Sequence, residues 1–284
     1  MTRVAFLGDS LTRGNASHEP GNGAHSPFKF LISDRGNYPL MVGALAESQG
    51  AHWTVRNFGH GGRTVGADCN RSYTATTELA EAVRWSPKLC VLMLGTNDAW
   101  VNGCWNERAF EGEFERLSRF ILKIPSRPRL AIVLPPPNHV ERSARLLERE
   151  VYPRISAVTS RLQRELPQKL EHGCALQRVI GPIDLRPAFE AKCRLKSPQT
   201  EQVQADLRRT QLWPYSRCFL HKWARGDGSR LQMSDGVHQS AFGAAVIAET
   251  VHQALEPAKH GCQVRSLQQA RQRWNGVKRL SLQG

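Results

Sequence analysis

Several patterns that would place a sequence in a familiar class are missing from this 284-residue chain. It has no apolar run of the roughly 18 to 20 residues that cross a membrane. Its first apolar segment begins at about Arg3, which leaves no room for a signal peptide. The seven cysteines include no C-x-x-C pair, so we expect neither a disulfide framework nor a zinc site. These absences predict a soluble chain in a reducing compartment, with the cytoplasm favoured.

Motifs for nucleotides and metals are also missing. The glycine-rich stretch NFGHGGRT, at residues 57–64, lacks the G-K-[ST] ending of a phosphate-binding loop and the spacing of a dinucleotide fingerprint. No pair of histidines has metal-ligand spacing with a carboxylate. We therefore predict no metal and no cofactor.

The chain is strongly basic, with a formal net charge of +14. Such a charge can attract polyanions, but the basic residues are spread along the chain, which is typical of a solvated surface. We expect no specific nucleic-acid partner and at most a weak contact with polyanions through the basic surface; the sequence carries no signal for an oligomeric state. From Lys259 onward the chain is basic and rich in Gln, so we predict a domain over 1–258 and a surface tail over 259–284.

Apolar stretches alternate with amphipathic ones along the domain. Runs such as LCVLML, at 89–94, are apolar at consecutive positions, as expected when helices cover both faces of a strand. The alternation predicts a parallel sheet between layers of helices. The strand candidates are 3–8, 53–58, 89–94, 129–134 and 176–180, and the helix candidates are 38–49, 75–85, 107–123, 142–166 and 240–255. Two long segments, 14–37 and 189–234, are predicted to be loops.

Four polar, glycine-containing segments lie at the ends of predicted strands or at the start of the last helix. In parallel sheets the active groups gather beyond the carboxyl ends of the strands. Each segment is weak evidence alone: a serine in the position of Ser10 caps a helix far more often than it acts as a nucleophile, and Asp235 and His238 could be a cap and a surface imidazole. The segments are GDSL at 8–11, NFGHGGRT at 57–64, GTND at 95–98 and SDGVHQSAFG at 234–243.

Taken together, these segments resemble the four blocks of the GDSL-type (SGNH) hydrolase family, which supply Ser, Gly, Asn and His in that chain order. The resemblance covers about residues 3–255. It implies a three-layer α/β/α sandwich of flavodoxin-like type, and a serine esterase that works through an acyl-enzyme. The G-x-S-x-G elbow of α/β-hydrolases is absent around Ser10.

The chemistry of ester hydrolysis gives each matching residue a role. A serine hydroxyl needs a neighbouring base, for which His238 is the candidate, and Asp235 is placed three residues earlier to orient its ring. The resemblance assigns the oxyanion hole to the backbone N–H groups of Ser10 and Gly62 and to the side-chain amide of Asn97.

Three further residues near these blocks are candidates for contact with substrate: Asp9, His60 and Trp100. For His60 the alternative is a surface position, and for Trp100 it is ordinary packing. Asp9 and Asp98 are expected to hold their loops through side-chain to backbone hydrogen bonds.

The acyl group is expected to be short. The family includes carbohydrate O-acetylesterases, lysophospholipases, short-chain lipid esterases and thioesterases. The GTND and NFGHGGRT segments most resemble the small-ester and carbohydrate-acetylesterase members, which implies an O-acetyl or other short-chain ester of a glycan or small molecule, and the polar loop at 14–37 favours a short acyl group. One alternative is a lysophospholipase or thioesterase that acts on lipid esters. Another is a non-catalytic protein of the same fold that binds polyanions. A phosphate-binding flavodoxin-like protein is disfavoured by the missing phosphate-loop spacing.

Overall fold

The computed structural model describes residues 1–14, 37–67, 69–101, 103–138, 140–166, 169–171, 174–193, 218, 220–221, 232–233, 237–239 and 241–255. Most of the predicted loops at 14–37 and 189–234 lies outside these residues, as does the predicted tail at 259–284.

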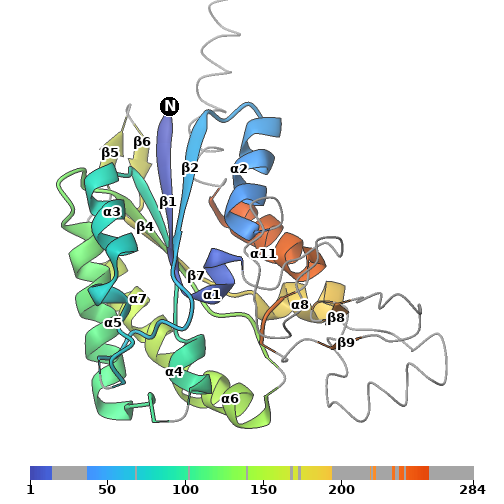
Figure 1. The fold of residues 1–284 in the computed structure, drawn as a ribbon. Coiled ribbons are helices and arrows are strands. Elements are labelled where there is room, and N and C mark those ends of the chain that lie inside the picture. Colours follow the sequence, from blue (N-terminus) through green and yellow to red (C-terminus); the bar gives the residue numbers. More distant parts are fainter. Residues whose placement is uncertain are drawn as a thin grey trace, which may run out of the picture.

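A sheet of five parallel strands forms the centre of the molecule, with the strand order β2-β1-β3-β4-β7 (Figure 1). All five strands therefore end at the same edge, which carries the loops of interest. The strands are β1 (Thr2–Gly8), β2 (Trp53–Gly59), β3 (Leu89–Met93), β4 (Arg129–Val133) and β7 (Val179–Ile183).

Helices cover both faces of the sheet, which explains the consecutive apolar residues of its strands. Along β1, Ala5 and Leu7 belong to one buried cluster, while Val4 and Phe6 belong to the other. The first cluster includes side chains of α3 (Thr77–Trp85), α5 (Glu107–Leu122) and α7 (Tyr152–Glu165). The second includes those of α2 (Tyr38–Ser48), α8 (Arg186–Cys193) and α11 (Ala241–Leu255). The fold is the predicted three-layer α/β/α sandwich.

The ends of several elements differ from the prediction. The last strand runs from Val179 to Ile183 rather than over 176–180. Its predicted end was too early because Gly181 and Pro182 suggest a strand break but are tolerated in an edge strand such as β7. The helix predicted at 142–166 consists of α6 (Glu141–Leu146), a π-helical turn η2 (Leu147–Val151) and α7.

The sequence prediction missed the shortest elements, because a single turn or a two-residue strand carries no measurable period. They are α1 (Ser10–Arg13), α4 (Thr96–Trp100), the 3₁₀ turn η1 (Tyr73–Ala75), and the pairs β5 (Lys169–Glu171) with β6 (Cys174–Leu176) and β8 (Leu220–His221) with β9 (Gln232–Met233). It also missed α8, which begins at Arg186 and runs to Cys193, into the segment predicted as a loop from residue 189. In the described ranges, no helix has both the length and the apolarity of a membrane span.

The prediction for the cysteines is wrong. Disulfides join Cys69 to Cys104 and Cys193 to Cys218, while Cys90 is a buried free thiol. The bonded partners are 35 and 25 residues apart in the chain, so the fold brings them together and local spacing does not reveal them. Because disulfides persist in oxidising compartments, the argument from the cysteines for a reducing compartment no longer holds.

Candidate active site

Ser10 is the first residue of α1, the one-turn helix that follows β1 directly. The cap of this helix is Asp9, whose Oδ1 atom accepts the backbone N–H of Leu11 at 2.9 Å. The interpretation of Ser10 as the helix cap is therefore wrong. Since Asp9 has the extended backbone of a cap and Ser10 is already helical, the Ser10 hydroxyl is left for another contact.

That contact is with His238, which lies just before α11. The Nε2 atom of His238 is 2.8 Å from the Oγ atom of Ser10. Both residues are buried, with 5% of Ser10 and 3% of His238 exposed, so the surrounding protein shields the hydrogen bond from bulk water. Asp235 lies outside the described residues, and its role stays a prediction.

The loop after β2 is attached to the same place. The side-chain amide of Asn57 donates to the carbonyl oxygen of Thr12 at 2.7 Å. The backbone N–H of His60 donates to the carbonyl oxygen of Gly8 at 2.9 Å. Gly62 follows with φ +74°, a left-handed conformation that favours glycine. These contacts bring the predicted Gly62 block against the strand end and helix that carry Ser10.

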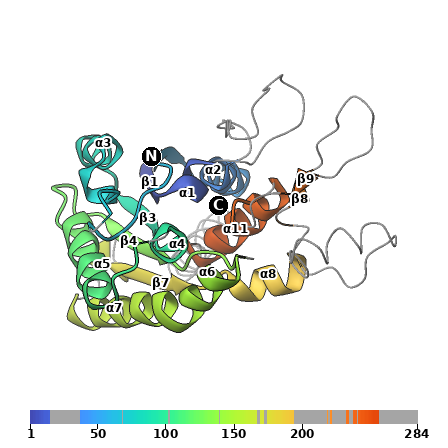
Figure 2. The ribbon, with the colours of Figure 1, turned by 60° about the horizontal axis from the view of Figure 1, so that its bottom comes forward.

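The GTND segment after β3 is bonded to this loop in turn. The Asn97 amide donates to the carbonyl oxygen of Arg63 at 2.9 Å. The Asp98 carboxylate accepts the backbone N–H groups of Val65 and Gly66, each at 3.1 Å. Asp98 thus holds the loop of Gly62, as predicted. Figure 2 looks toward the edge where the strands end and shows α4 between α1 and α6.

Two carboxyl groups in this region have raised pKa values. Burial raises the pKa of Asp98 to about 6, although the hydrogen bonds from the backbone N–H groups of Val65 and Gly66 act to lower it. Burial also raises the pKa of Asp9 to about 7, opposed by the N–H of Leu11 and by the nearby His238 ring. Asp9 is only 1% exposed, and its capping bond supports the expected loop-holding role. Its contact with substrate stays a prediction.

The remaining candidates lie on the same loops. The rings of Trp100 and His238 meet edge to face, with their centroids 6.2 Å apart and their planes at 87°. His60 is held on its loop by two partners, because its Nδ1 atom lies 2.7 Å from a carboxylate oxygen of Glu78 and its Nε2 atom lies 2.9 Å from Nη2 of Arg63. Substrate contact by Trp100 and His60 stays a prediction.

A disulfide close to the candidate active site was not predicted from the sequence. The Cys69–Cys104 disulfide joins the segment after the Gly62 loop to the segment after α4. The Thr64 hydroxyl lies 3.7 Å from the Cys69 sulfur. The sequence offered only a weak signal for this pairing: Cys69 follows the segment at 57–64, and Cys104 follows the segment at 95–98.

The arrangement has the parts that acyl transfer needs. An imidazole within hydrogen-bond distance of a serine hydroxyl can take its proton. Backbone and amide donors on neighbouring loops can stabilise an oxyanion, provided that they point toward it. The fold and this site define a hydrolase of the α/β/α type with a serine–histidine pair at the carboxyl edge of its sheet.

Comparison with known proteins assigns the family. The GDSL-like Lipase/Acylhydrolase family matches residues 6–246. The chain belongs to this family and is a carboxylic ester hydrolase. Among curated proteins, none matches the chain significantly.

Solved structures with this fold include several esterases. One is a putative arylesterase from Agrobacterium tumefaciens, 21% identical, with a TM-score of 0.51 over 91% of this chain and 100% of that chain. Another is an acetylxylan esterase from Geobacillus stearothermophilus, 15% identical, with a TM-score of 0.52 over 89% and 93%. The M. smegmatis aryl esterase is 16% identical, with a TM-score of 0.51 over 94% and 100%. At these identities the likeness establishes the fold.

Proposed function

We propose that the chain is a serine esterase in which Ser10 is the nucleophile and His238 the general base. The observation that carries this proposal is the 2.8 Å contact between His238 Nε2 and Ser10 Oγ. The hydroxyl attacks the ester carbonyl carbon while His238 takes its proton, then His238 returns that proton to the departing alcohol. Water, activated by the same imidazole, releases the acid from the acyl-enzyme.

The oxyanion of the tetrahedral intermediate needs donors that are already in place. We assign them to the backbone N–H groups of Ser10 and Gly62 and to the Asn97 amide. The hydrogen bond from Asn97 to the Arg63 carbonyl uses one of the two amide protons and fixes the side chain. The second proton is then available to the substrate oxygen. Asp235, three residues before His238 in the chain, would orient the imidazole.

The proposed substrate carries a short acyl group, in particular an O-acetyl group on a carbohydrate. Two observations support this choice. The bulky ring of Trp100 meets the His238 ring edge to face, and His238 contacts Ser10, so a large side chain lies near the proposed nucleophile. Among the solved structures with this fold is one titled an acetylxylan esterase.

Labelling with a fluorophosphonate, followed by peptide mapping, tests the nucleophile without any assumption about the natural ester. We expect the label on Ser10 and no label in the Ser10→Ala variant. Modification of another residue in place of Ser10 would remove Ser10 from the mechanism.

A series of p-nitrophenyl esters of increasing acyl length tests the acyl preference. We expect kcat/KM to be highest for acetate and to fall as the chain lengthens. A maximum at eight or more carbons would instead assign the chain to the lysophospholipase or thioesterase type.

A further inference from the structure

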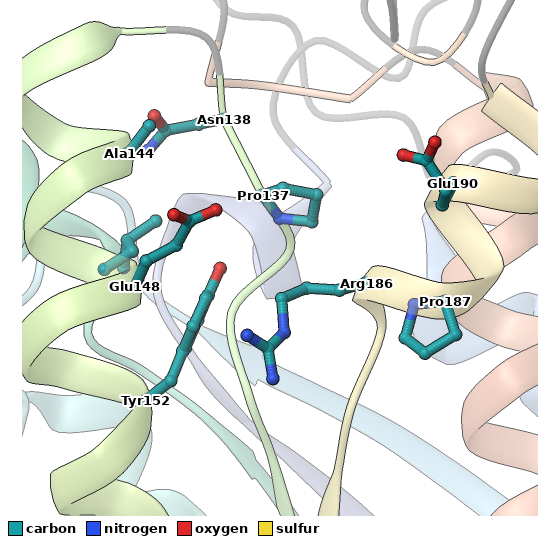
Figure 3. Close-up of a pocket in the computed structure, with 9 residues that line it drawn as sticks. Pro137, Asn138, Ala144, Glu148, Tyr152, Arg186, Pro187 and Glu190 are labelled. Carbon is teal, nitrogen blue, oxygen red and sulfur yellow. The ribbon is translucent and has the colours of Figure 1, made fainter.

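A hollow lies at the carboxyl edge of the sheet, beyond the ends of β4 and β7. Its volume is about 340 Å³, within the range of small-ligand sites, roughly 300 to 1,000 Å³. One wall is formed by α6, η2 and the start of α7, the other by α8, and the loop after β4 lies between them (Figure 3). We call this hollow the α6–α8 cleft.

The cleft lies next to the proposed catalytic loops. A Cβ atom on Gly95, which begins the GTND segment, would lie 2.9 Å from Val151 and 3.4 Å from Pro135. Val151 is followed in the chain by Tyr152, and Pro135 is followed closely by Pro137 and Asn138. The residues of these segments that line the cleft are Tyr152, Pro137 and Asn138. The turn that presents Asn97 therefore packs directly on the cleft's own segments.

The floor of the cleft is buried and includes an aromatic ring. Tyr152 and Asn138 are 3% and 6% exposed. The Asn138 amide donates to the Ser143 hydroxyl at 2.8 Å, while its buried Oδ1 atom accepts no hydrogen bond from the described residues. Buried acceptors are almost always paired, so this oxygen calls for a donor that the described residues do not supply.

The rim is polar and exposed, and its charges decide what fits. Glu148 projects from one wall, and Arg186 and Glu190 project from the other (Figure 3). The guanidinium of Arg186 lies 4.8 Å from the centre of the Tyr152 ring and is held by Asp184, with Nη2 to Oδ2 at 2.7 Å. The two rim carboxylates would repel an anionic ligand, and the central guanidinium would repel a cationic one. Charged groups of either sign are poor neighbours for a hydrocarbon chain.

The wall beside Glu148 has an unusual backbone. The π-helical turn η2 covers Leu147–Val151; Glu148 is its second residue, and Tyr152 follows it as the first residue of α7. Such turns insert one residue into a helix and are frequent at functional sites. Here the turn lies where the helix passes both the cleft and Gly95.

We propose that the α6–α8 cleft binds the hydroxyl-rich, uncharged alcohol portion of the ester, such as the neighbouring sugar unit of an acetylated oligosaccharide. Sugar hydroxyls would donate to Glu148, Glu190 and the free oxygen of Asn138, and would accept from Arg186. This proposal rests on the proposed esterase function and names its alcohol specificity. The cleft does not take part in bond making.

The test compares an acetylated xylo-oligosaccharide with p-nitrophenyl acetate, which has no sugar. Ala144→Phe places a ring in the cleft from its α6 wall, and Glu148→Gln removes a rim charge. We expect the ratio of kcat/KM for the oligosaccharide to kcat/KM for p-nitrophenyl acetate to fall roughly tenfold or more in each variant. Glu47→Gln, an exposed position on α2, is the matched control and should leave the ratio unchanged. An unchanged ratio in both cleft variants overturns the proposal, as does a preference of the wild type for acetylcholine over the oligosaccharide.

Binding provides a readout independent of turnover. In a Ser10→Ala background, calorimetric titration with an unacetylated xylo-oligosaccharide should detect binding that Ala144→Phe weakens roughly tenfold or more. Hydrolysis of p-nitrophenyl acetate by the wild type without such binding would overturn the cleft proposal and leave the esterase function standing. Binding that depends on the cleft in a chain that hydrolyses neither ester would overturn the esterase function and support the sugar site.

Discussion

His238 Nε2 lies 2.8 Å from Ser10 Oγ, although 228 positions separate the two residues in the chain. The serine comes from the first strand–helix turn, and the histidine comes from the segment before the last described helix. The contact is buried. Its consequence for the rate of ester hydrolysis can be measured on a single variant.

Replacing the histidine should remove the base and leave the fold. We expect His238→Ala to lower kcat for p-nitrophenyl acetate about 10³-fold or more, because the serine then has no proton acceptor within reach. The measurement is steady-state kinetics near neutral pH. His52→Ala, at an exposed histidine just before β2, is the control and should retain wild-type rates. Comparable losses in both variants would contradict the assignment.

Removing the Asn97 amide should affect kcat more than KM. The proposed oxyanion donor acts in the transition state, so we expect Asn97→Ala to lower kcat roughly 10²- to 10³-fold while KM changes little. Because Asn97 also bonds to the Arg63 carbonyl, thermal unfolding of the variant is needed to show that the loop is still folded. An increase in KM without a loss of kcat would indicate a role in ground-state binding instead.

The raised pKa of Asp9 makes stability depend on pH in a defined direction. Burial raises this pKa from 3.8 to about 7 in the folded chain, so the folded state binds the proton more tightly than the unfolded state. The contribution of Asp9 to stability is greatest below about pH 4 and is lost as the pH rises to about 7, by at most about 1.4 kcal/mol per pH unit.

Asp9→Asn should remove this dependence, since Asn also caps helices well. We expect the free energy of unfolding in urea to fall less between pH 4 and pH 7 in the variant than in the wild type. Glu47→Gln should follow the wild-type curve. Parallel curves for Asp9→Asn and the wild type would show that the Asp9 pKa is not raised by folding.

The Cys69–Cys104 bond should contribute measurably to stability. Its partners are 35 residues apart, and loop-entropy estimates for a closure of that size give about 3 to 4 kcal/mol. We expect the double variant Cys69→Ser/Cys104→Ser to lose about this amount in chemical denaturation. Because Cys193–Cys218 is also reducible, reductant should destabilise the double variant less than it destabilises the wild type. Equal effects of reductant on both would contradict a contribution from this bond.

The sequence predicts the layers of this fold well, because they depend on patterns that a chain displays locally. Consecutive apolar residues such as those of β3 indicate a strand covered on both faces, and the four motif segments coincide with the strand ends and with His238. What the sequence does not display is pairing across long distances. Whether Asp9 or Ser10 caps α1 depends on the backbone conformation of a single residue. The Cys69–Cys104 and Cys193–Cys218 disulfides join cysteines that only the completed fold brings together.

The α6–α8 cleft was likewise beyond prediction. Tyr152 and Arg186 belong to no motif, and they approach each other only because β4 and β7 are neighbours in the sheet. The π-helical turn beside them lies within a continuous helical pattern, which shows no sign of an inserted residue.

Because His238 lies late in the chain, just before α11, it is synthesised long after Ser10, Gly62 and Asn97. By residue 104 a growing chain already contains Ser10, the Gly62 loop, Asn97 and the first pair of bonded cysteines. Its serine stays an ordinary alcohol until α11 docks against α2 and α8 and brings the imidazole to it. Translation that stops short of α11 would yield a chain that contains the proposed nucleophile without its proposed base, so we expect reactivity toward esters only in chains whose synthesis has passed α11.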